Sequence, residues 1–173
     1  NPIMRFLDIL MAFPTLLLAM AILAVLDPQF INLVIALVIP LTPRTARVLR
    51  GSILEQREMD YFIAAQAVGV GDLRRIRRHL LPNCMAPLLV QQTYILAVAM
   101  LSEAALSFLG IGLPPSVPTL GSILNGARSW LRSAPWMSLY PGLFITLMVL
   151  GFNMLGDGLR DVPRPEHRGL RAP

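Results

Sequence analysis

The sequence predicts an all-α, polytopic membrane helix bundle, because apolar residues dominate it and occur in long uninterrupted stretches. Of its 173 residues, 55% are hydrophobic and only 14% are charged, whereas soluble globular domains have about 25% charged residues. A bilayer core about 30 Å thick requires roughly 20 mostly apolar residues per helical span. Arginine, aspartate and glutamate are absent from residues 9–26, 28–43, 79–102 and 133–156. A single domain over residues 1–173 is therefore expected, with about four spans near 7–26, 30–49, 84–109 and 136–156.

The positions of the basic residues predict the orientation of the chain. All 15 are arginines, and most of them follow the second or the fourth apolar stretch. Cytoplasmic loops of membrane proteins are enriched in basic residues. Residues 44–83 and 157–173 are therefore expected in the cytoplasm, and residues 27–29 and 110–135 outside.

The first two predicted spans contain prolines. Pro14 lies inside the first span, and Pro40 and Pro43 lie inside the second. Membrane helices tolerate such prolines where neighbouring groups satisfy the freed carbonyls. We expect these prolines either to kink their helices or to take part in gating.

Residues 51–83 form the expected cytoplasmic loop, and its first half favours a helix over 54–68. The apolar residues of that helix recur at spacings of three, four and seven, namely Leu54, Tyr61, Phe62, Ala65 and Val68. Gly69 should end the helix, because glycine adopts the left-handed conformation at little cost.

The second half of the loop predicts a shorter, basic helix. Asp72 should accept the first free backbone N–H groups of this helix. Leu73, Ile76 and Leu80 share one face, arginines surround them, and Pro82 should break the helix. An apolar edge with a cationic surround fits either the groove of a partner protein or anionic lipid headgroups.

After the third span, the sequence predicts an external loop with an amphipathic helix. Residues 110–118 (GIGLPPSVP) cannot continue a helix, so the span should end near Gly110. Apolar residues then repeat at helical spacing in TLGSILNGARSWLR. This helix is expected either as an interfacial structural element or as part of the mouth of a pathway.

The sequence excludes several kinds of chemistry. Cys84 is the single cysteine, so an internal disulfide or a cysteine metal cluster is not expected. Only His79 and His167 offer imidazoles, which argues against a histidine-based catalytic or metal site. A Gly-x-x-x-x-Gly-Lys phosphate loop is impossible because the chain has no lysine. We therefore expect no catalytic residue, no metal and no cofactor bound by this chain.

Glu103 is the one acidic residue near the interior of a predicted span. Ionisable groups within a bilayer are expensive, and they usually face the helix bundle or water. Glu103 lies one to two helical turns before the predicted outer end at Gly110. Glu103 could therefore either make a structural hydrogen bond or line a transport pathway.

Three segments resemble the membrane subunits of ABC importers. AAQAVGVGDLRRIRRHLLP is similar to their cytoplasmic loop signature, Glu-Ala-Ala, three residues, Gly, nine residues, Ile-x-Leu-Pro. Ala64, Ala65, Gly69, Leu81 and Pro82 match this signature, while Ile63 and His79 replace its Glu and Ile. LSEAALSFLGIGLPP at 101–115 and the segment 133–161 resemble the dipeptide, oligopeptide and nickel branch. The tail phrase Val-Pro-Arg-Pro at 162–165 departs from the Leu-Asp-Pro-Arg-like ending of that branch.

The resemblance implies a permease subunit in the bacterial cytoplasmic membrane. Full-length members have six spans in a type I transmembrane domain, so this sequence would be a C-terminal fragment without the first two. The implied partners are cytoplasmic ATP-binding subunits, which bind the ATP, a second permease subunit in a heterodimer, an external substrate-binding protein and lipid. The chain itself would not be an enzyme. The residues implied for ATPase coupling are Tyr61, Ala64, Ala65, Ala67, Gly69, Gly71, Asp72, Leu73, His79, Leu81 and Pro82.

Three rival functions can be weighed against this one. The glycine turn before a basic helix resembles a DNA-binding helix-turn-helix, but the apolar flanks would tether it to a membrane, so no nucleic-acid partner is expected. A secondary transporter needs several buried coupling residues, and Glu103 is the single candidate in the predicted spans. An ABC permease for another solute would share the loop but not the two later segments. The sequence does not specify the solute.

Overall fold

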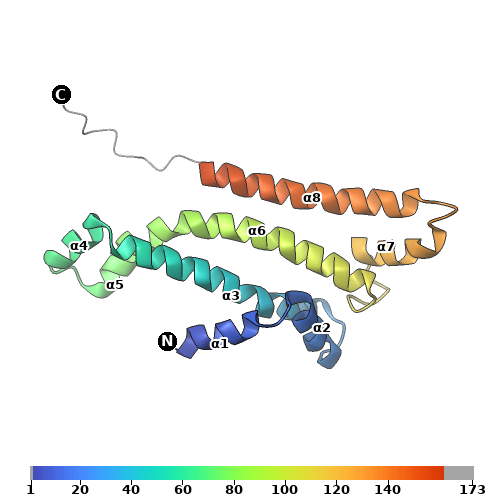
Figure 1. Ribbon diagram of the computed structural model, residues 1–173, viewed down its shortest axis with the longest axis horizontal. Helices are drawn as coiled ribbons and strands as arrows, with labels where there is room; N and C mark the ends of the chain where they lie inside the picture. The colour runs from blue at the N-terminus through green and yellow to red at the C-terminus, as the bar shows by residue number, and fades with distance from the viewer. Residues whose placement is uncertain (1, 162–173) are drawn as a thin grey trace.

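The computed structural model describes residues 2–161, which form helices joined by short connections (Figure 1). The elements are α1 (Pro2–Met11), α2 (Thr15–Val25), α3 (Phe30–Arg57), α4 (Asp60–Ala67), α5 (Asp72–Arg75), a π turn (Ile76–Leu80), α6 (Leu81–Phe108), α7 (Leu120–Ala127), a 3₁₀ turn (Arg128–Trp130) and α8 (Trp136–Asp161). Residues 2–161 contain no β-strand, and the predicted all-α class is confirmed. The predicted tail after 161 lies outside the described residues.

The long helices α3, α6 and α8 run side by side, with α6 between the other two (Figure 1). The apolar core lies where α2, α3 and α6 meet, and its buried residues are Ala19, Leu23, Leu33, Ala36, Leu37, Leu41 and Leu106. On the other side of α6, a Cβ atom added to Gly156 of α8 would collide with Thr93 Oγ1. Small residues of this kind let membrane helices approach closely.

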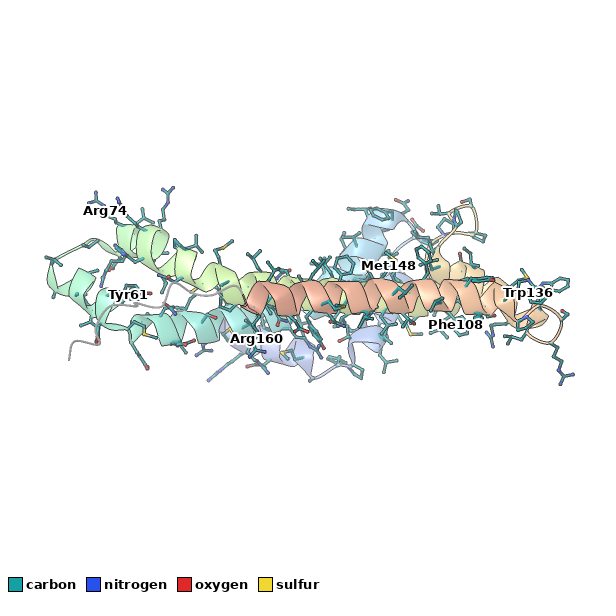
Figure 2. All side chains as sticks on the ribbon, turned by 90° about the horizontal axis from the view of Figure 1, so that it is seen from above. Tyr61, Arg74, Phe108, Trp136, Met148 and Arg160 are labelled. Carbon is teal, nitrogen blue, oxygen red and sulfur yellow. The ribbon has the colours of Figure 1, made fainter. Side chains whose placement is uncertain are left out.

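Within residues 2–161, three helical segments are long and apolar enough to cross a membrane. They are Phe30–Arg57, Asp72–Phe108 and Trp136–Arg160, and a fourth span arises if α1 and α2 count as one broken span. Large apolar side chains are exposed along α8, among them Leu139, Leu143, Phe144, Leu147, Leu150 and Met154 (Figure 2). Such an apolar surface suits lipid or another membrane subunit rather than water.

The first predicted span is not one continuous helix. The chain bends by 94° between α1 and α2, so the span predicted near 7–26 consists of two helices with the expected kink next to Pro14. Pro14 stands directly before α2 with φ −57° and ψ 130°. Proline has no N–H to donate, and it disfavours helical geometry in the residue before it. By contrast, α3 continues through Pro40 and Pro43 and extends beyond the predicted end at 49.

The C-terminal end of α6 agrees with the sequence expectation. The helix ends at Phe108, and Gly110 follows with φ +81°. The backbone N–H of Ile111 then donates to the Leu106 carbonyl oxygen at 2.9 Å. The amphipathic helix begins after Thr119, whose hydroxyl accepts from the Ser122 N–H while Ser122 Oγ accepts from the Thr119 N–H. It is shorter than expected, because α7 gives way to the 3₁₀ turn at Arg128.

We predict that α4 and the connection before α7 lie on opposite sides of the membrane, as the arginine distribution indicates. Gln66 and Ser116 are exposed, whereas the single cysteine, Cys84, is buried. In the full-length protein with Cys84→Ser, an impermeant maleimide should label Ser116→Cys on intact spheroplasts. The Gln66→Cys variant should react only after the membrane is permeabilised. Labelling of Gln66→Cys on intact spheroplasts would reverse the assigned orientation.

Candidate functional site

The segment between α3 and α6 extends past the Arg160 end of α8 and forms the candidate site (Figures 1 and 2). Its first part is not the single helix expected over 54–68. Instead, α3 runs to Arg57, Met59 is extended at φ −75° and ψ 142°, and α4 begins at Asp60. This change of direction accompanies the burial of Phe62 with Leu80 and Cys84, which removes apolar surface from water.

Gly69 ends α4 as the sequence predicts. Its φ is +74°, in the left-handed region that favours glycine. The Val70 N–H donates to the Ala65 carbonyl oxygen at 3.1 Å, and the Gly69 N–H donates to that of Gln66 at 3.0 Å. These two bonds satisfy carbonyls that the end of the helix would otherwise leave free.

Asp72 does not cap α5, so that expectation is corrected. The residue before α5 is Gly71, and no side chain caps the helix. Asp72 lies one position later, inside the first turn, where its carboxylate pairs with the guanidinium of Arg75. A negative charge in the first turn still suits the positive end of a helix.

Pro82 does not break the second helix of the loop. Residues 72–108 form one long helical segment, in which the π turn at Ile76–Leu80 precedes α6. Pro82 occupies the first turn of α6, directly after this wider turn. A π turn changes the local hydrogen-bond ladder, and it thereby accommodates a residue that lacks an N–H and crowds the preceding turn.

A hydrogen-bond network centred on Tyr61 joins three helices. The Tyr61 hydroxyl donates to Gln56 Oε1 at 2.6 Å and accepts from Asn83 Nδ2 at 3.3 Å. Asn83 Nδ2 also donates to the His79 carbonyl oxygen at 2.6 Å. The ring centroids of Tyr61 and His79 are 6.5 Å apart. The network therefore connects α4 with the last turn of α3 and the first turn of α6.

Arg75 is the one arginine among those at 74, 75, 77 and 78 that folds inward. Its side chain is 14% exposed, and its guanidinium carbon lies 5.5 Å from the centroid of the Phe62 ring. Together with the Asp72 pair, this cation–π contact joins α5 to α4. Arg74, Arg77 and Arg78 remain exposed, and with Gly71, Asp72 and Leu73 they line an open concavity of about 730 Å³.

The residues predicted for coupling divide between the interior and the surface of the loop. Of these residues, Ala65 is only 8% exposed, whereas Leu73 is 71% exposed. Val68, which helical spacing placed on the same side as Ala65, is 80% exposed. The predicted residues that lie at the surface are Tyr61, Ala64, Ala67, Gly69, Gly71, Asp72, Leu73, Leu81 and Pro82, while His79 is half-buried. The apolar face expected from helical spacing is thus split, and Ala65 belongs to the packing of the loop itself.

Glu103 lies at the far end of α6 from the loop. Its Oε1 accepts a hydrogen bond from Ser107 Oγ at 2.6 Å, one helical turn away. Ser107 is buried, and Glu103 is half-buried. This contact supports the structural interpretation of Glu103, while a place along a transport pathway stays a prediction.

Sequence patterns did not indicate Gln56 and Asn83 as members of the site. Both lie outside the helical spacing that picked out the apolar residues of the loop, and polar residues at such positions are ordinarily solvated. Gln56 is nevertheless buried. A buried polar side chain needs a hydrogen-bond partner, but burial could be recognised only from the fold.

The chain is similar over most of its length to one known family. The family model described as "Binding-protein-dependent transport system inner membrane component" matches residues 1–166. A protein of Brucella suis biovar 1, provisionally named a peptide transport system permease protein, is 51% identical over 163 residues. That match covers 94% of this chain and 55% of the relative.

Two further relatives carry names that specify small peptides. The di/tripeptide transport system permease protein DppC of Pseudomonas aeruginosa is 46% identical over 164 residues, which cover 95% of this chain and 54% of the relative. The dipeptide transport system permease protein DppC of Escherichia coli K12 is 40% identical over 164 residues, which cover 95% of this chain and 55% of the relative. The chain therefore spans about half the length of these relatives.

Proposed function

Because this chain belongs to the family of inner membrane components of binding-protein-dependent transport systems, we propose that it forms part of the translocation pathway of an ATP-driven peptide importer. The names of two relatives support di- and tripeptides within the expected class of di- and oligopeptides. Membership of this family and several apolar helices locate the chain in the bacterial inner membrane. Nickel is the second substrate that the resemblance implies, and an ABC importer permease for another solute or a secondary transporter is the alternative.

The observation that supports this function best is the protruding loop, because it is built into two candidate spans. Helix α4 follows α3 after two residues, and α5 continues through the π turn into α6. A partner that binds α4 and α5 could therefore displace both α3 and α6. We propose that this partner is a cytoplasmic ATP-binding subunit, which binds and hydrolyses the ATP while this chain hydrolyses none.

The other proposed partners follow from the same function. A second permease subunit would complete the pathway, and an external substrate-binding protein would deliver the peptide. The exposed apolar residues of α8 offer a surface for lipid or for the second permease subunit. No residue of this chain is proposed to bind a cofactor.

The exposed side of α4 is the surface that we assign to the ATP-binding subunit. Ala64 and Ala67 are exposed on it, and their small side chains allow a partner to approach the helix backbone closely. Ala65, which the loop signature also contains, is buried. It therefore contributes to this surface only indirectly, by holding α4 in place.

Placing a charge at Ala64 is expected to weaken the contact with the ATP-binding subunit several-fold. In the full-length transporter, Ala64→Asp would bury a carboxylate without a counterion at the interface, which is costly. We expect lower co-purification of the ATP-binding subunit and lower substrate-stimulated ATP hydrolysis, with normal insertion in the membrane. The Ala64→Ser variant is the control, because it keeps a small, uncharged side chain.

The same experiment separates the contact surface from the function. Equal recovery and equal ATPase stimulation in Ala64→Asp and wild type would reject the assigned surface. A full-length wild type that co-purifies with no ATP-binding subunit would count against an ATP-driven importer. Uptake of a labelled dipeptide, compared with uptake of nickel, decides between the two substrate classes.

A further inference from the structure

We propose that Tyr61 is a positioning residue whose hydroxyl ties α4 to both α3 and α6, so that a displacement of α4 moves the two helices together. This inference rests on the proposed function, since it assigns a role within the coupling loop. The Tyr61 hydroxyl oxygen makes two hydrogen bonds to residues on different helices, Gln56 on α3 and Asn83 on α6. Tyr61 is labelled in Figure 2, within the loop that extends past Arg160.

The chemistry of the two partners fixes the direction of both hydrogen bonds of the Tyr61 hydroxyl. The Asn83 amide nitrogen can only donate, so it donates to the Tyr61 oxygen, and the hydroxyl proton is then directed to Gln56 Oε1. Gln56 lies in the last turn of α3 and is 7% exposed. Its oxygen would therefore be left unsatisfied in a buried place if the hydroxyl were absent.

These hydrogen bonds bypass the irregular connections on both sides of α4. Along the chain, α4 joins α3 through Glu58 and Met59, which are not helical, and it joins α5 through the turn at Gly69. The Tyr61 hydroxyl instead reaches Gln56, five positions before it, and Asn83, 22 positions after it. It thus supplies a direct link to each long helix.

Apolar packing alone would not provide the same constraint. Phe62 already packs against Leu80 and Cys84, so α4 would stay against the spans without the hydroxyl. Apolar contacts are non-directional, however, and allow neighbouring helices to slide. Hydrogen bonds weaken steeply as their angles change, so they also fix the orientation of α4. Without them, movement of α4 would be absorbed within the loop.

The decisive measurement is the amount of peptide transported per ATP hydrolysed. In the full-length transporter with its partner subunits, reconstituted in lipid, Tyr61→Phe removes only the hydroxyl. We expect ATP hydrolysis to persist while peptide transported per ATP falls several-fold. Tyr140→Phe is the matched control, since Tyr140 is 65% exposed on α8 and its hydroxyl makes no hydrogen bond to any residue of the described chain. It should leave the ratio unchanged.

Hydrogen exchange tests the link without depending on transport. We expect the α4 amides of the full-length protein to exchange about tenfold faster in Tyr61→Phe, as the loss of one buried hydrogen bond implies. Gln56→Met should have a similar effect. The double variant should lose little more than either single variant, because both changes remove the same bond.

The outcomes distinguish the inference from the function on which it rests. Unchanged exchange in Tyr61→Phe would overturn the proposed link, and faster exchange with a normal transport ratio would overturn its role in positioning. If the wild-type transporter did not couple ATP hydrolysis to uptake, the proposed function would fail. Hydrogen exchange would still decide whether the hydroxyl holds α4.

Discussion

Replacing Gly121 by valine is expected to prevent α7 from packing on α6 and to reduce the folded protein in the membrane to a small fraction of the wild-type amount. A Cβ atom at this position would lie 2.8 Å from Ser107 Cβ and 2.9 Å from the Ala104 carbonyl carbon, and closer still to the Ala104 oxygen. Two of these atoms are backbone of α6, so a side-chain rotation cannot relieve the clash. The helices would have to separate.

The expected cost lies at the upper end of the range for overpacking, about 3 kcal/mol. Ser107 adds to it, because its hydroxyl is held by Glu103 and its side chain also lies against Gly112. A shift of α7 would thus disturb the hydrogen bond that satisfies Glu103. An unsatisfied carboxylate near the interior of a span adds to the destabilisation.

The measurement is the yield and thermal unfolding midpoint of the full-length protein in detergent. Gly126→Val is the matched control, because Gly126 lies in the same helix and a Cβ there would meet no atom within 4 Å. We expect that control to behave like wild type. Equal yield and equal unfolding midpoints for the two variants would show that α7 does not pack on α6 as described.

The two prolines at 14 and 82 show where the sequence is a poor guide. Pro14 was expected to kink its span or to take part in gating, and the chain bends there by 94°; Pro82 was expected to end a helix, and the helix continues. The same residue type has opposite effects because the conformation of the neighbouring turn determines whether the helix can continue through the proline. A π turn lies before Pro82, whereas a non-helical break lies at Pro14. Neither turn has a recognisable pattern in a single sequence.

Local conformations near glycine were predictable for a physical reason. Gly69 and Gly110 both have positive φ, as expected where an apolar helical pattern ends at glycine. Such an end depends on the residue itself and on the few carbonyls before it. It therefore needs little knowledge of the rest of the fold.

The orientation of the loop residues was not predictable in the same way. Helical spacing counted from Leu54 placed Ala65 and Val68 on one side, but α4 ends at Ala67, so Val68 stands at the end of the helix and is exposed while Ala65 is buried. The contact of Tyr61 with Asn83 spans 22 positions. Such a long-range contact depends on the packing of α4 against α6, and spacing along the chain does not indicate it.

Replacing Gly69 by valine is expected to reduce the proposed ATP-driven uptake of the full-length transporter by tenfold or more while leaving the spans inserted. A Cβ at this position would meet no atom within 4 Å, so the penalty comes from the backbone conformation alone. At φ +74° an ordinary side chain costs roughly 1–3 kcal/mol, and a β-branched one lies at the upper end. The chain would leave this conformation and lose the bond from Val70 to Ala65.

Two further variants make this prediction specific to the turn. Gly71→Val should be tolerated, because Gly71 has an ordinary φ of −58° and equally open surroundings. Gly69→Asn should be intermediate, since asparagine adopts the left-handed conformation more readily than valine. Uptake of labelled peptide, normalised to the protein in the membrane, gives the comparison. Both glycines have room for a side chain, so the two variants differ only in backbone conformation. Normal uptake in Gly69→Val would mean that uptake does not depend on the left-handed turn between α4 and α5. An equal loss of uptake in Gly71→Val would mean the same.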